Sequence, residues 1–418
     1  MLRLEPGARR FFAAYGQSAL GNGAGYVALV VLAYQAWHSP WAISLVLLAD
    51  FVPAMLFGPL FGAAADRWSR RRLAIISDIA RAVAFIGVAL VGGIWGIVAF
   101  ALLAGVGAGL ATPAVLAALP GMVDEERLPA ATSLYGALTD AGRALGPAIA
   151  ALGLLVASPE VVAATNGATF LVSAAVLATL GFGARPERTG ERTSLLREAR
   201  EGISATARMT GIRVLIGASS GLLLFAAVLN VTELLVAEDL GSGDVGYSVL
   251  VTAAGIGFVV GSLSGAGGAP IAELKRRYIG GILVMALGIA LFGIAPIFAL
   301  ALLGLGLTGV GNGLLLTNER LIFQKVVPDR MLGRAFALAD TAGCWAFAIA
   351  FASAGLLLEQ VGATSVLLGA AVAAAAICLL TAYALRSTWE DEGAEASYAV
   401  SSSAGPELPA STARSASV

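Results

Sequence analysis

The sequence is poor in the residues on which most enzymes and extracellular modules depend. Among its 418 residues are one histidine, two cysteines and two lysines, and only 13% of the chain is charged. A single histidine, His38, argues against histidine-based catalysis and a histidine-ligated metal. Cys344 and Cys378 lie inside apolar segments, so no disulfide framework is expected. No nucleophile–base–acid set stands out, and we expect no enzyme activity, cofactor or metal site.

Charge and hydropathy together define the class of protein. The net charge of -1 gives no indication of a nucleic-acid partner. Hydrophobic residues make up 58% of the chain and the mean hydropathy is +0.86, which is too apolar for a pair of soluble domains. The sequence therefore predicts an all-α protein that crosses a membrane several times.

Apolar segments of membrane-spanning length recur along the chain. At about 1.5 Å per residue, each is long enough to cross a hydrocarbon core about 30 Å thick. Twelve are found, at about 11–36, 41–65, 73–92, 95–119, 131–157, 161–183, 212–237, 245–269, 278–295, 297–321, 332–358 and 363–386. The first is too long for the apolar region of a signal peptide.

Basic residues predict the orientation of these segments. Counted from a cytoplasmic N-terminus, the inside regions hold every basic residue that lies between segments, and the outside loops hold none. Loops on the cytoplasmic side carry an excess of Lys and Arg. We therefore expect twelve transmembrane helices with both termini in the cytoplasm.

A charged interruption divides the chain near its middle. Residues 184–211 alternate Arg and Glu and are expected to form a cytoplasmic linker between six-helix bundles at 1–183 and 212–387. Glu126-Arg127-Leu128 is echoed by Asp329-Arg330-Met331, 203 residues later, which indicates parallel repeats. The tail, 388–418, is rich in Ser, Ala, Glu and Pro and is predicted to be disordered.

The second segment ends in an unusual motif. Gly62-x-x-x-Asp66-Arg67-x-x-Arg70-Arg71 follows directly on apolar sequence. It resembles the signature between helices 2 and 3 of the major facilitator superfamily, with Ser69 where glycine is usual. The resemblance implies that Gly62 packs against helix 11 and that Asp66 and the arginines latch the cytoplasmic side shut. The alternative is an ordinary basic loop.

A second motif lies in the fifth segment. Gly142-x-x-x-Gly146-Pro147 resembles the helix 5 pattern of antiporters in this superfamily, although Ala150 and Ala151 replace its later glycines. The resemblance implies a bend in helix 5 that seals the outer gate against helix 8. Plain helix packing is the alternative. With Asp78-Ile-Ala-Arg81, the similarity extends over about residues 10–386 and indicates the multidrug, macrolide and siderophore exporter branch.

Charged residues well inside the segments are candidates for energy coupling. Each costs roughly 2.5 kcal/mol or more in lipid unless it faces water or a partner. They are Asp50, Asp140, Arg143, Glu233 and Asp340. Desolvation is expected to favour protonated carboxyl groups, so protons could load and unload. Asp340 has no basic neighbour at i±3 or i±4 and is the preferred carrier, whereas Asp140 and Arg143 are spaced to form an intrahelical pair.

Uncharged polar residues in the segments are candidates for the substrate cavity, with Arg143. They are Ser18, Asn22, Tyr26, Asn230, Asn312 and Trp345. Each could instead form a hydrogen bond to a neighbouring helix. Asn22 stands where the first helix of the exporter branch often has aspartate, so one titratable group is missing.

Two function classes remain open. The favoured one is a monomeric secondary transporter in a bacterial cytoplasmic membrane that exports an amphipathic drug, antibiotic or siderophore-like metabolite by proton antiport and so contributes to multidrug resistance. Its expected partners are that small molecule, protons and membrane lipids. The alternative is a non-coupled facilitator, lipid-handling or ligand-sensing protein on the same scaffold.

Overall fold

The chain folds as a bundle of long helices. The computed structural model describes residues 5–58, 60–61, 68–180, 209–265, 268–386 and 388–389, with the side chains of Asp329 and Arg330 excepted. Within these ranges there is no strand, and twelve helices have 17 residues or more. The predicted twelve-helix, all-α architecture is confirmed.

Six of the long helices belong to the N-terminal half of the chain. They are α1 (Pro6–Trp37), α2 (Pro40–Leu56), α4 (Arg70–Leu90), α5 (Ile94–Ala118), α6 (Leu128–Leu154) and α7 (Pro159–Thr179). In this half α1 packs on α6 and α7, and α4 packs on α5 and α7.

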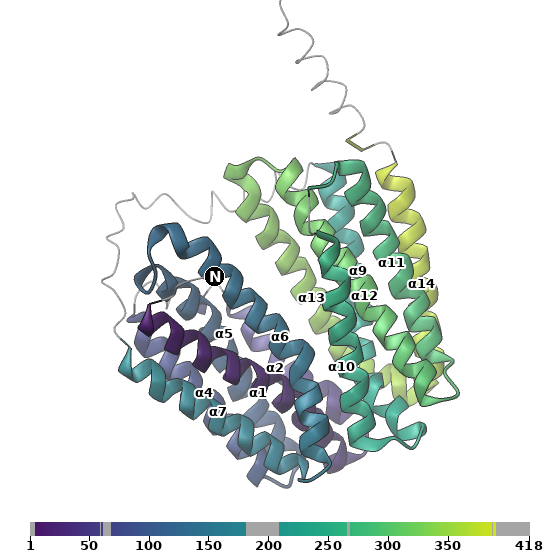
Figure 1. The fold of residues 1–418 in the computed structure, drawn as a ribbon. Coiled ribbons are helices and arrows are strands. Elements are labelled where there is room, and N and C mark those ends of the chain that lie inside the picture. The colour runs from purple at the N-terminus through teal and green to yellow at the C-terminus, as the bar shows by residue number, and fades with distance from the viewer. Residues whose placement is uncertain are drawn as a thin grey trace, which may run out of the picture.

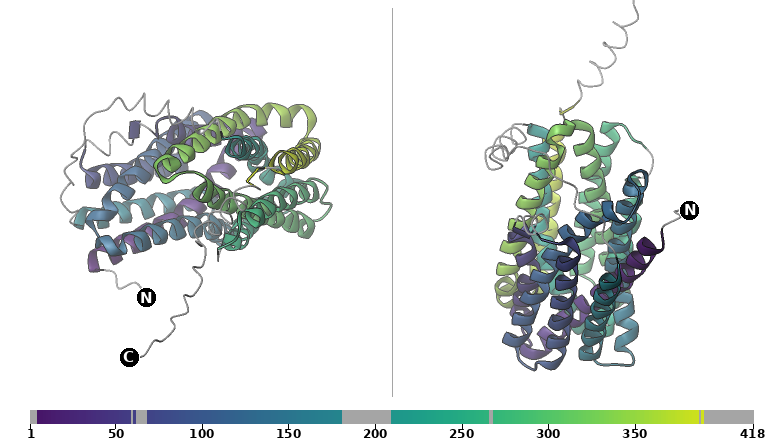
Figure 2. Two further views of the ribbon diagram at one scale, coloured as in Figure 1. Left: turned by 90° about the horizontal axis from the view of Figure 1, so that it is seen from above. Right: turned by 90° about the vertical axis from the view of Figure 1, so that its left-hand side faces the viewer.

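The C-terminal half repeats this arrangement. Its helices are α9 (Thr210–Asp239), α10 (Gly243–Ser262), α11 (Ile271–Gly293), α12 (Phe298–Val326), α13 (Asp329–Val361) and α14 (Ala363–Leu385). Here α12 packs on α10 and α11, and α9 packs on α13 and α14. Figure 2 shows the two groups of helices side by side when the bundle is seen from above.

Hydropathy alone does not identify all twelve helices. Ten of the described helices are long and apolar enough to cross a membrane. The helix α2 is shorter, and α6 is not among the ten although it has 27 residues, because Asp140, Arg143 and several hydroxyl side chains lower its hydropathy. The second helix also ends at Leu56 instead of the predicted 65: Phe57 forms a turn, and helical backbone is present again at Gly58.

The two ends of the bundle carry opposite charges. One end, called the basic end here, holds Arg70, Arg127, Arg213, Lys275, Lys325 and Arg386 at helix ends. The other, called the acidic end, holds Glu160, Glu238, Asp239, Asp244 and Glu359. The halves lie apart at the basic end and together at the acidic end (Figure 1). The predicted linker and tail lie almost entirely outside the described residues.

Candidate functional site

The halves meet where α2 packs on α13 and α6 packs on α10. Aromatic rings fill the first of these contacts: Phe51 of α2 lies 5.8 Å from Phe351 and 6.1 Å from Phe347, measured between ring centroids. Nearer the acidic end, a Cβ added to Gly355 would lie 2.9 Å from the Cα of Trp41, so the two backbones are in close contact. We call this junction between the halves the seam.

The second contact of the seam uses small residues of α6 and α10. A Cβ on Gly255 would lie only 2.6 Å from the Cα of Ala144, so the helices touch here. Helix 5 and helix 8, which are α6 and α10 here, are therefore in contact as predicted. The glycines of the helix 5 motif, however, face α1. A Cβ on Gly142 would lie 2.5 Å from the carbonyl oxygen of Ala19, in α1.

Gly146 also faces α1, because a Cβ there would lie 2.5 Å from the Cα of Gly23. Pro147 is buried beside it, and α6 continues beyond it to Leu154. The glycines of the motif thus join two helices of the N-terminal half. Sealing the gate directly against helix 8 is not their geometric role, since Ala144 makes that contact.

Two hydrogen bonds close the seam at the acidic end. The amide of Gln35 donates to Asp244 at 3.1 Å, and the hydroxyl of Ser39 donates to Glu359 at 2.5 Å. In both, the donor belongs to the N-terminal half and the acceptor carboxylate to the C-terminal half. Separation of the halves at this end breaks both bonds.

Removing the two donors should favour opening at the acidic end. A hydrogen bond contributes about 1 kcal/mol net, so Gln35→Ala with Ser39→Ala should raise the open population about fivefold or more. Spin labels on Trp37→Cys and Val361→Cys, both exposed at this end, would report the distance in a Cys344→Ala/Cys378→Ala background. An unchanged distance distribution would contradict a latch role for these bonds.

Glu233 of α9 lies against the seam. It is 4% exposed, and among the described residues it forms no hydrogen bond or ion pair. It interacts electrostatically with Tyr26 of α1 and Tyr247 of α10, so helices of both halves surround it. A carboxylate in such a place has no compensating cation, and its charge would be costly.

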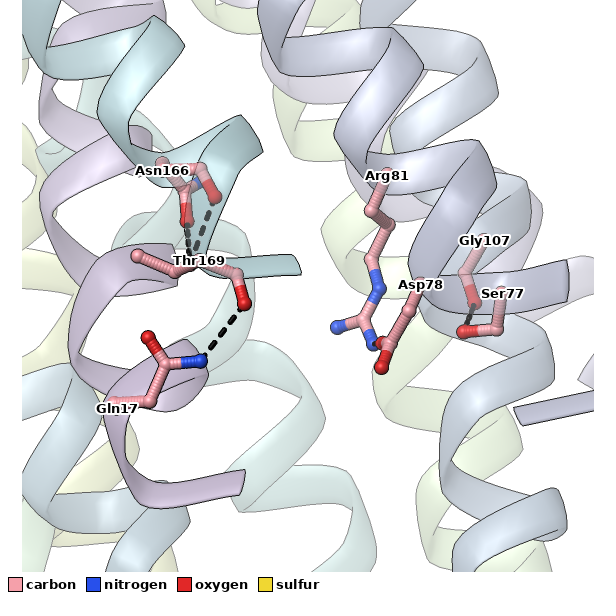
Figure 3. A network of polar contacts seen from close by, with 7 residues as sticks. All are labelled: Gln17, Ser77, Asp78, Arg81, Gly107, Asn166 and Thr169. Carbon is pink, nitrogen blue, oxygen red and sulfur yellow. Dashed lines mark hydrogen bonds and ion pairs between the residues drawn. The ribbon is translucent and has the colours of Figure 1, made fainter. Parts of the chain in front are cut away.

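Asp50 of α2, by contrast, has a cation nearby. Arg81 of α4 interacts electrostatically with it and forms an ion pair with Asp78. The guanidinium carbon of Arg81 also lies 4.1 Å from the centre of the Phe170 ring, in a cation–π contact. Figure 3 shows Arg81 and Asp78 close together in the interior of the N-terminal half.

Asp340 also has a cation that the sequence did not indicate. Arg320 of α12 interacts electrostatically with it, and both side chains are exposed. The expectation that Asp340 has no basic neighbour at i±3 or i±4 holds along α13, but α12 supplies a cation from outside the helix. Its preference as proton carrier therefore loses its main argument.

Glu319 is a buried carboxyl group that the sequence reasoning missed. It is 7% exposed, and its carboxyl oxygen lies 2.9 Å from the hydroxyl oxygen of Ser219 in α9. It lies near the end of the predicted segment 297–321 and is not among the candidates, which lie well inside the segments. The signal would have been an acidic residue directly before Arg320 within an apolar segment.

The Ser219 hydroxyl has one proton and several acceptors. Its oxygen lies 3.0 Å from the Leu215 carbonyl and 2.9 Å from Glu319. When Glu319 is a carboxylate, it accepts a hydrogen bond from the Ser219 hydroxyl. When Glu319 is protonated, it donates a hydrogen bond to Ser219, and Ser219 then donates to the Leu215 carbonyl. Tyr278 donates to the same carbonyl at 3.2 Å. The network is satisfied in both protonation states, and a hollow of about 20 Å³ lined by Ser219 and Asn312 has room for one water.

Asp140 and Arg143 do not form the predicted pair. Within the described chain no ion pair joins them, Asp140 is half-buried and Arg143 is exposed. The two residues thus remain separate polar groups on α6.

The other predicted cavity residues differ in exposure. Ser18 is buried, Asn22 and Trp345 are exposed, and Tyr26, Asn230 and Asn312 are half-buried. The described ranges contain no group of three or more His, Cys, Asp and Glu side chains that could hold a metal ion.

The predicted latch lies mainly outside the described residues. Gly62, Asp66 and Arg67 belong to that part, whereas Arg70 and Arg71 open α4. The guanidinium of Arg71 donates to the Ala178 carbonyl of α7, so this arginine is bound within its own half.

Relatives of the chain are bacterial transporters. It is 24% identical to the uncharacterized MFS-type transporter YfiS of Bacillus subtilis (strain 168), covering 87% of this chain and 89% of that one. It is 25% identical to the putative bacilysin exporter BacE of the same strain, covering 81% and 86%. It is 27% identical to the enterobactin exporter EntS of Shigella boydii, covering 80% and 81%.

Solved structures show the same fold. A bacterial homologue of the human lysosomal transporter Spinster, crystallised in an inward-facing and unoccupied conformation, has a TM-score of 0.70 at 14% identity. The match covers 91% of this chain and 98% of that one. The model of the Major Facilitator Superfamily matches residues 11–279, which is more than half of the chain. The protein is therefore a multi-pass membrane protein that belongs to the major facilitator superfamily.

Proposed function

We propose that the protein is a monomeric exporter that moves an amphipathic small molecule across the bacterial cytoplasmic membrane by proton antiport. The bundles, 1–183 and 212–387, would alternate access to a cavity between them, with the basic end and both termini in the cytoplasm. Exporters of bacilysin and enterobactin among its relatives support outward transport. Arg143, Arg320 and Asp340 are exposed on helices of both halves and supply polar groups for the cavity.

One observation carries the coupling mechanism: Glu233 is buried where the halves meet. With the seam closed, Glu233 has no cation or hydrogen bond to stabilise a charge among the described residues. The closed seam therefore favours neutral Glu233. With the seam open to the acidic end, water reaches the carboxyl group and it can ionise or take up a proton from that side.

The direction of coupling follows from this geometry. The transporter closes the seam when it returns from the state open at the acidic end to the state open at the basic end. Because the closed seam favours neutral Glu233, this residue carries a proton during the return. When a substrate enters the cavity from the cytoplasm, its polar groups supply the partner that Glu233 lacks, and the carboxyl group then releases its proton toward the cytoplasm. Substrate binding favours the reverse movement, which takes the substrate outward. Protons thus move inward as the substrate moves outward.

Other carboxyl groups complete the relay in this proposal. Glu319 changes its protonation without leaving an unsatisfied group, because Ser219 can reverse its hydrogen bond. Asp50 and Asp340 each face an arginine, so they suit substrate contact or proton exchange with the cavity. Asp140 remains a candidate of the same kind.

The experiment is transport in proteoliposomes with an imposed pH gradient. A macrolide, a dipeptide antibiotic and a catecholate siderophore would be offered in turn, with a pH-sensitive dye inside the vesicles. The expected result is accumulation of one of them against its concentration gradient, with matching dissipation of the pH gradient. Downhill movement that ignores the pH gradient would favour the facilitator, and no movement would favour the lipid-handling or sensing alternative.

A further inference from the structure

A groove lies at the basic end between α11 and α14, away from the seam. It has a volume of about 670 Å³. Its walls include the apolar side chains Ile271, Ile279, Ala382 and Leu385. This size and lining suit part of an acyl chain beside the two helices.

Cations surround the open side of this groove. Arg276 is exposed and forms no hydrogen bond or ion pair within the described residues. The Arg386 guanidinium stacks on Tyr383 at 4.1 Å from the ring centre, a contact that leaves its N–H groups available. The Lys275 ammonium donates to the Thr388 carbonyl at 2.7 Å and keeps its full charge.

The nearest acid on α11 does not cancel these charges. Glu273 accepts from Arg277 at 2.5 Å, and Arg277 also donates to the Ser264 carbonyl, in the short turn just after α10. That pair therefore lies toward α10, and Glu273 does not line the groove. Among the described residues that line the groove, three are positively charged and none is a carboxylate.

An aromatic side chain completes the site. Trp389 lines the groove, and its indole ring packs against the backbone of α9 at Gly211. Tryptophan is favoured at the height of lipid headgroups, where its ring is apolar and its N–H is a donor. The lining of the groove thus combines charged, aromatic and apolar side chains.

We propose that this groove binds the phosphodiester headgroup of an anionic phospholipid. The Arg276 and Arg386 guanidinium groups contact the phosphate, Lys275 adds charge, and one acyl chain lies along Ile271 and Ile279. Basic pockets between transmembrane helices at this depth are suited to anionic headgroups. The site is independent of substrate transport and of proton coupling.

Another occupant is available in the chain itself. The residues after Trp389 are Glu390, Asp391 and Glu392, whose charge would also complement the groove. A phospholipid is favoured because it fills the apolar part as well as the cationic part. The test distinguishes the two.

The experiment is native mass spectrometry of the full-length protein with phosphatidylglycerol or phosphatidylcholine of the same acyl chains. We expect one phosphatidylglycerol to be retained at a concentration at least tenfold lower than phosphatidylcholine requires. Arg276→Gln with Arg386→Gln should lower this retention at least fivefold, and millimolar inorganic phosphate should not displace the lipid. A circular-dichroism melt checks that the variant remains folded.

The matched control is Arg9→Gln with Arg10→Gln, two exposed arginines of the N-terminal half at the same end. It should retain the lipid like the wild type. Equal losses in both double variants, or equal retention of the two lipids, would overturn the site. The groove would be assigned to the tail instead if the lipid is retained only after Glu390, Asp391 and Glu392 are replaced by their amides. It would be a phosphate site if inorganic phosphate displaces the lipid.

Discussion

Gly146→Leu is expected to disrupt the N-terminal half and not only to block a gate. A Cβ at this position would lie 2.5 Å from the Cα of Gly23 and 2.7 Å from the carbonyl oxygen of Leu20, both backbone atoms of α1. Backbone atoms cannot turn aside, so the helices must separate. Overpacking typically costs 1–3 kcal/mol, and we expect about 3 kcal/mol or more here. Thermal unfolding in detergent should show Tm falling by about 5 °C or more.

The matched control lies on the same helix. Gly136→Leu makes the same substitution in α6, where an added Cβ meets nothing within 4 Å. It should unfold within about 1 °C of the wild type, since leucine also favours helix over glycine. A Gly146→Leu variant with unchanged Tm but no transport would return this motif to the gating role that its resemblance implies.

The fold could be predicted from the sequence because hydropathy acts locally. Apolar runs longer than about 17 residues must cross the membrane as helices, since no other element satisfies its backbone there. The helix α6 falls short by hydropathy, yet the sequence pattern predicts its segment, 131–157, and the positions of the basic residues support the count of twelve. The end of the second helix was less predictable, because a turn at Phe57 interrupts the predicted segment after Leu56.

Charge partners could not be predicted, because they depend on how helices pack. A carboxyl group was judged by its neighbours at helical spacing, but Arg81 acts on Asp50 from α4 and Arg320 acts on Asp340 from α12. The i+3 spacing of Asp140 and Arg143 made a pair possible without enforcing one. Among the described residues, Glu233 has no cation beside it, a difference from Asp50 and Asp340 that the sequence pattern did not indicate.

Glycine motifs illustrate the same limit. Their spacing correctly indicates close helix contact, but the face that makes the contact depends on which helix lies beside it. In α6 the residues Gly142 and Gly146 face α1, whereas Ala144 faces α10 across the seam. A single helix thus stabilises its own half with one face and closes the transport path with another.

Glu233→Gln is expected to abolish proton-driven transport while the fold survives. Glutamine has the shape of protonated glutamate, so the seam can close without a proton and the cycle no longer requires one. Accumulation driven by a pH gradient in proteoliposomes should fall at least tenfold. The spin-label pair at Trp37→Cys and Val361→Cys should report a closed acidic end at every pH, whereas the wild type should open as pH rises and Glu233 ionises.

Three variants make the assignment specific. Glu359→Gln neutralises another seam carboxyl group but still accepts the Ser39 hydrogen bond, so it should keep gradient-driven transport. Glu319→Gln should reduce coupling, whereas Asp340→Asn, whose carboxylate faces Arg320, should mainly weaken substrate binding. Full coupling in Glu233→Gln with loss in Asp340→Asn would restore the preference that the sequence alone suggested. Full coupling in all of these variants would remove carboxyl groups from the mechanism and favour a facilitator.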